Sequence, residues 1–78
     1  MTTTYNVEFK RNGEWFAQHT CVQSQVEVID KAKAFWTALR SDGDRSCVRI
    51  TQGLPFDGRT VATFTRFGVL RWQSSILG

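Results

Sequence analysis

The chain has 78 residues, 41% of them hydrophobic and 22% charged, which is ordinary for one globular domain. No apolar run is long enough to cross a bilayer, and residues 1–4 lack the basic and apolar stretches of a secretion signal, so we expect a cytoplasmic protein with no membrane contact. The net charge of +3 arises in the second half, where residues 40–78 hold six arginines against three acids. We predict a single domain over residues 1–78, with loose tails at 1–4 and 74–78.

The first predicted hairpin joins residues 5–10 to residues 14–22. Residues 5–10 alternate apolar and polar side chains, which is typical of a half-buried strand. Asn12-Gly13 follows, and this dipeptide is the strongest short signal for a hairpin turn. The sequence therefore predicts two antiparallel strands that are adjacent in the sheet.

The length of this turn decides which aromatic side chain leaves the core. In a two-residue turn Phe9 faces Phe16, and Trp15 lies on the other side with Lys10 and His19. In a three-residue loop with a bulge, Phe9 faces Trp15 and Phe16 turns outward. We favour the two-residue turn, so we expect Trp15 to be the exposed aromatic.

A helix is predicted over residues 24–40, after this hairpin. Ser24 and Glu27 have the spacing of a capping box, and Gly43 supplies a stop signal. Apolar residues at three- and four-residue spacing form one stripe, which needs a sheet to cover it. Within that stripe we expect Phe35 and Trp36 to be largely buried.

Two further strands are predicted after the helix, over residues 45–52 and 59–67. The loop between them, residues 53–58, contains two glycines and the only proline, and we expect its Leu54 and Phe56 to fold back onto the core. Residues 69–73 are expected to add a short fifth strand. The predicted fold class is therefore α+β with the order ββαββ, in which one helix packs on one face of an antiparallel sheet.

No motif in the sequence predicts catalysis. We expect Cys21 and Cys47 to be free, buried thiols, with a single disulfide between them as the alternative. Together with His19 they lack the spacing of a zinc site, and side chains on one face of a strand lie about 6–7 Å apart, too far for a Cys–His hydrogen bond. The sequence therefore predicts no enzyme, no catalytic residue, no cofactor and no metal site.

The sheet face without a helix is the predicted working surface. Tryptophan and arginine are enriched at interface hot spots, and an uncovered face leaves them accessible. We therefore predict a non-enzymatic protein-binding module or inhibitor whose partner has an acidic surface, or which forms a homodimer through a strand edge. The candidate partner-binding residues are Trp15, His19, Arg49, Arg66 and Arg71. We expect Trp15→Ala and Arg49→Glu to leave the fold intact and to weaken binding.

Two alternative functions remain open. Arginines and aromatics on an open sheet also suit single-stranded nucleic acid, and Arg66-Phe67-Gly68-Val69 is similar to part of an RRM motif. The RRM order βαββαβ needs two helices, however, and this sequence predicts one. In size and architecture the chain also resembles small inhibitors encoded by phages and mobile elements, including anti-CRISPR proteins. That resemblance implies inhibition of a host defence complex.

Overall fold

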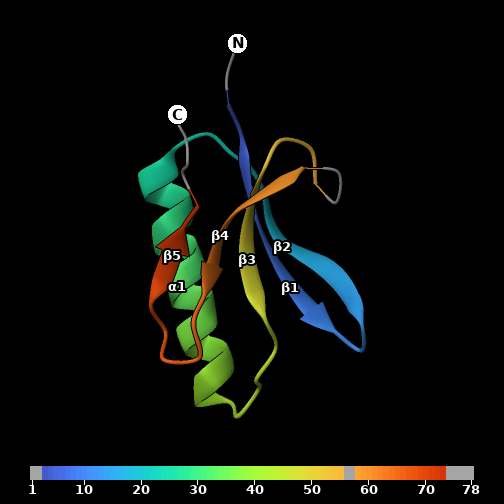
Figure 1. Ribbon diagram of the computed structural model, residues 1–78, viewed down its shortest axis with the longest axis vertical. Coiled ribbons are helices and arrows are strands. Elements are labelled where there is room, and N and C mark those ends of the chain that lie inside the picture. Colours follow the sequence, from blue (N-terminus) through green and yellow to red (C-terminus); the bar gives the residue numbers. More distant parts are fainter. Residues whose placement is uncertain (1–2, 56–57, 74–78) are drawn as a thin grey trace.

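A computed structural model describes residues 3–55 and 58–73. In these residues the chain forms one helix and five strands, and all adjacent strands are antiparallel (Figure 1). The sheet has the order β2-β1-β3-β4-β5, and the predicted α+β fold with a short fifth strand is confirmed. The elements are β1 (Tyr5–Arg11), β2 (Glu14–Val22), α1 (Gln25–Ser41), β3 (Val48–Gln52), β4 (Arg59–Phe64) and β5 (Leu70–Trp72).

The β1–β2 turn has the predicted two-residue geometry. Asn12 and Gly13 have φ angles of 56° and 81°, the left-handed values that a type I′ turn requires at both positions. Phe9 consequently faces Phe16, and Lys10 faces Trp15. The expected exposure is nevertheless wrong, because Phe16 lies on an edge strand and stays 44% exposed, whereas Trp15 is half-buried.

Further along β2, the pairing with β1 is irregular. The register shifts on either side of Val7, so that His19 lies opposite Val7, which is fully buried. Cys21 has a φ of 58°, and its N–H donates to Asn6 Oδ1 at 3.2 Å. Because cross-strand partners share a face, His19 lies on the helix side of the sheet, and its expected place on the uncovered face is wrong.

Helix α1 begins and ends as its sequence predicts. The Ser24 hydroxyl accepts a hydrogen bond from the Glu27 N–H at 3.2 Å, and Gly43 has a φ of 78° just after the helix. Glu27 also pairs with Lys31 one turn later, at 3.8 Å. No helix in the described part of the chain has the length and apolarity needed to span a bilayer.

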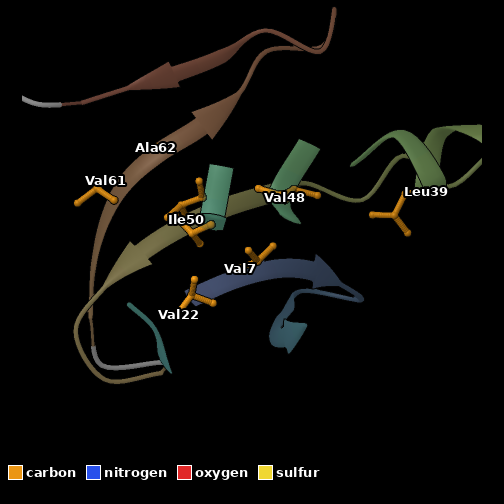
Figure 2. Close-up of a cluster of buried hydrophobic side chains, with 9 residues drawn as sticks. Val7, Val22, Leu39, Val48, Ile50, Val61 and Ala62 are labelled. Carbon is orange, nitrogen blue, oxygen red and sulfur yellow. The ribbon is translucent and has the colours of Figure 1, made fainter. Parts of the chain in front are cut away.

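The core lies between α1 and the central strands. Figure 2 shows Val7, Val48 and Ile50 of β1 and β3 within this cluster. Phe35 and Trp36 pack against it, but both are half-buried rather than largely buried, because their rings reach its margin. The buried members are Val7, Val22, Val28, Ala32, Leu39, Val48, Ile50, Val61 and Ala62.

The third and fourth strands are shorter than predicted because their ends form hydrogen-bonded loops. Asp44 Oδ1 accepts from the Ser46 N–H at 2.8 Å, and the Arg40 guanidinium donates to the Asp44 and Ser46 carbonyls. In the β4–β5 turn the Thr65 N–H donates to the Val69 carbonyl at 2.9 Å. These contacts compete with strand pairing and end the ladder early.

The structure tests the predicted burial of Leu54 and of the two cysteines, whereas part of what was predicted for the loop and the chain ends lies outside the described residues. Leu54 is 69% exposed and does not fold back onto the core, and Phe56 lies outside the described part. Both cysteines are free, as predicted, but exposed rather than buried. The Thr4 carbonyl accepts from the Gly53 N–H at 2.9 Å, while residues 1–2 and 74–78 are not described.

Candidate functional site

The candidate site is the face of the sheet turned away from α1, which we call the open face. Successive side chains of a strand point to opposite faces of the sheet, and residues that pair across neighbouring strands lie on the same face. Val7 and Ile50 face the helix, and the residues next to them face the other way. One continuous row across the open face is Ala17, Glu8, Arg49, Thr63 and Arg71, with Trp15 and Lys10 in the next row along β2 and β1.

A stacked arrangement of three side chains occupies the middle of this face. Arg49 donates from Nε and Nη2 to Glu8 Oε1, at 2.9 and 2.7 Å. Its guanidinium carbon also lies 3.7 Å from the centroid of the Trp15 ring. Because the Glu8 side chain is 0% exposed and that of Arg49 is 20% exposed, this ion pair is shielded from water far better than an ordinary surface pair.

The buried carboxylate is connected to a wider polar network. The Thr51 hydroxyl donates to Glu8 Oε2 at 3.2 Å and accepts from Asn6 Nδ2 at 3.1 Å. Asn6 Nδ2 also donates to the Gly53 carbonyl at 2.9 Å. Asn6 and Thr51 are buried, so these bonds replace hydration that both residues lose on folding.

This network holds the Trp15 indole in place. One strand of the face supplies the carboxylate, the next supplies the guanidinium, and the edge strand supplies the ring. Lys10 approaches the same ring, with its Nζ 5.9 Å from the centroid. Contacts within the protein therefore hold the Trp15 ring in one position.

The structure brings three of the five predicted site residues to this face. Trp15 and Arg49 are in contact, and Arg71 lies in the same cross-strand row as Arg49, with Thr63 between them. Arg66 lies instead in the β4–β5 turn, where its guanidinium is 5.0 Å from the Phe67 ring. His19 lies beside Lys31 of the helix, and burial, followed by the charge of Lys31, lowers the pKa of His19.

Sequence reasoning missed Glu8 as the residue that organises the site. Its place at a polar position of an alternating strand predicts that it faces away from the core, which is correct. Its partner comes from β3, 41 residues away, and the order of strands in the sheet is not encoded in any local pattern. The pairing with Arg49 could not be read from either strand alone.

The sulfur and imidazole groups do not form a metal site among the described residues, where no group of three or more His, Cys, Asp or Glu side chains could hold a metal ion. Cys21 lies beside Asn6, whereas the Cys47 carbonyl accepts from the Lys10 N–H at 2.9 Å. The two cysteines therefore border different parts of β1.

Comparisons with protein-family models, with curated proteins and with solved structures found no match to this chain.

Proposed function

We propose that this protein is a non-enzymatic protein-binding module, and that its open face binds an acidic surface of the partner. The observation that carries the proposal is the ordered Trp15 ring, held against Arg49 on a sheet face that no described helix covers. Fixed aromatic side chains of this kind contribute strongly to protein interfaces, because they bury a large area at a low cost in side-chain entropy.

The charge of the open face supports an acidic partner. Glu8 is the only acid in its central row, and it is already paired with Arg49. Lys10 and Arg71 are exposed, and neither forms an ion pair with a described residue. The face therefore presents uncompensated positive charge beside Trp15, on β1, and at the far edge of the sheet, on β5, which favours association with carboxylates of a partner.

The three residues have different roles in this proposal. Trp15 contributes the buried contact area, and Arg71, which has no ion pair with a described residue, offers its guanidinium for a bidentate contact to a carboxylate. Arg49 keeps Trp15 in position and balances Glu8, so its own donors are largely committed within the protein. The earlier expectation that Arg49→Glu leaves the fold intact is therefore replaced: that change would set two carboxylates against each other in a buried place.

An affinity purification from lysate, with and without nuclease, tests the proposal. The bait is the full chain, and the matched variants are Arg71→Glu on the open face and Arg59→Glu on the other side of the sheet. We expect the parent chain to capture a protein partner even after nuclease treatment. We expect Arg71→Glu to lose this partner and Arg59→Glu to retain it. Both variants replace an arginine by a glutamate, so a difference in partner capture between them reflects the position of the substituted residue.

Two results would overturn the proposal. Equal capture by Arg71→Glu and Arg59→Glu would show that the open face is not the working surface. Loss of every partner after nuclease, with affinity that falls steeply and linearly with the logarithm of salt concentration, would assign the face to nucleic acid instead.

A further inference from the structure

We propose that the cavity between the last turn of α1 and the β4–β5 turn is a second binding site, and that it binds a phosphate group through Arg40, Arg45 and Arg66. This site lies on the helix side of the sheet and is separate from the open face. It requires no partner protein and therefore stands or falls independently of the proposed function.

The cavity has a volume of about 280 Å³. Its described lining includes the three arginines, together with Trp36, Phe64 and Thr65, and no described lining residue is acidic. The arginines come from three segments: the helix end, the loop that follows it and the turn after β4. The helix end with the loop after it, and the more distant turn after β4, thus bring three arginine residues to the lining of one small cavity.

The positive charge of this cavity is not compensated by the nearest acid. Asp44 forms an ion pair with Arg11 and accepts hydrogen bonds from Ser46, and these contacts lower the pKa of Asp44, those of Ser46 most strongly. Arg40 donates to the Asp44 and Ser46 carbonyls, which are neutral acceptors and leave its charge in place. Neither Arg45 nor Arg66 has an ion pair with a described residue.

The end of the helix is the main electrostatic objection, because its carbonyl groups carry partial negative charge. Three of those carbonyls accept hydrogen bonds from the residues that follow the helix. The Asp42 N–H donates to the Ala38 carbonyl, the Gly43 N–H to that of Arg40 and the Asp44 N–H to that of Leu39, at 3.2, 3.1 and 2.8 Å. Three full charges outweigh what remains of the helix dipole.

The small volume and the arginine-rich lining favour a compact anion over a larger ligand. The volume is at the small end for ligand pockets, which are about 300–1,000 Å³ for drug-sized molecules. The Trp36 ring is already contacted by Phe64, stacked at 5.7 Å, and by the Arg40 guanidinium at 4.6 Å, so little ring surface remains for a base to stack on. A phosphate has more acceptor oxygens than a carboxylate, so it can contact Arg45 and Arg66 together with the part of the Arg40 guanidinium that does not bond the Asp44 and Ser46 carbonyls.

Trp36 also supplies a local reporter. Its indole Nε1 is buried and has no hydrogen-bond partner among the described residues, and its ring lines the cavity. In a nitrogen–proton NMR spectrum each tryptophan gives one indole signal, and loss of one signal in Trp36→Phe assigns it.

The test is a titration of the full chain with inorganic phosphate, at constant ionic strength maintained with chloride. We expect a saturable shift of the Trp36 indole signal, and about tenfold weaker binding in Arg45→Gln or Arg66→Gln, the size expected for one charge-assisted contact. Arg59→Gln is the matched control, since it removes the same charge from β4 away from the cavity, and it should change affinity less than twofold.

A second titration, with a phosphomonoester, shows whether the site prefers an esterified phosphate group or the free phosphate ion. Tighter binding of glycerol phosphate than of inorganic phosphate assigns the site to an esterified group, and the reverse assigns it to the free anion. The proposal is overturned if the Trp36 signal does not respond, if chloride alone gives the same shift, or if Arg59→Gln weakens binding as much as Arg45→Gln and Arg66→Gln do.

Discussion

The open face and the cavity lined by Arg40, Arg45 and Arg66 both contain arginine beside tryptophan, but they differ in what balances the charge. On the open face Arg49 is paired with a fully buried carboxylate and contacts Trp15. In the cavity, Arg45 and Arg66 have no ion pair with a described residue. The difference indicates two roles for one residue type: we expect a compensated arginine to maintain the structure, and we propose that arginines without an ion pair to a described residue bind a ligand.

The largest expected effect comes from breaking the compensated pair. Removing one partner of a buried ion pair typically costs roughly 3–5 kcal/mol, and Arg49→Glu adds repulsion with Glu8. We therefore expect Arg49→Glu to lower the free energy of unfolding by at least about 3 kcal/mol in a denaturant titration. Arg71→Glu is the control, and as an exposed residue it should stay within about 0.5 kcal/mol of the parent. If Arg49→Glu and Arg71→Glu have the same free energy of unfolding, the ion pair of Arg49 with Glu8 does not stabilise the fold as proposed.

A smaller effect is expected in the second region, where the β4–β5 turn packs on the helix. Gly68 has a φ of 87°, and a Cβ there would lie 2.8 Å from the Trp36 ring. Gly68→Ala should therefore cost about 1–3 kcal/mol, through backbone strain and displacement of the indole. Gly43→Ala, which shares the positive φ but has open space around it, separates strain from contact. If the two variants lose equal stability, the contact with Trp36 contributes nothing.

The smallest effect concerns His19, which the structure removes from the open face. Burial and Lys31 lower its pKa below 6.5, so the folded state disfavours the protonated form. The neutral His19 therefore contributes stability that is fully present above the pKa of His19 in the unfolded chain. This stability is lost as the pH falls through the lower pKa of His19 in the folded protein. His19→Gln should flatten the stability profile from about pH 7 to pH 5 while leaving partner capture unchanged. If His19→Gln no longer captures the partner, His19 belongs to the binding surface after all.

Local patterns were sufficient to predict the elements but not their relations. Asn12-Gly13 predicted the turn geometry and register correctly, because the left-handed backbone of a type I′ turn selects these residues. The capping pair of Ser24 and Glu27 likewise predicted where the helix begins. These features depend on residues within a few positions of one another.

Features that depend on distant contacts escaped prediction. The irregular pairing near Val7 turned His19 to the other side, since one extra residue reverses which face a side chain occupies. Trp15 was expected to be exposed, but Arg49, which contacts it, comes from a strand two places along the sheet. The arginines of the cavity come to line one space only after α1 and the β4–β5 turn pack together.

A double-mutant cycle on Glu8 and Arg49 tests the central claim most directly. The four proteins are the parent, Glu8→Gln, Arg49→Gln and the double variant, and the measurement is the free energy of unfolding of each. We predict that each single change costs about 3 kcal/mol and that the double variant recovers part of that loss, with a coupling energy of about 1.5–3 kcal/mol. Additivity within about 0.5 kcal/mol would contradict the account, because Arg49 would then be no more committed to the structure than the arginines of the cavity.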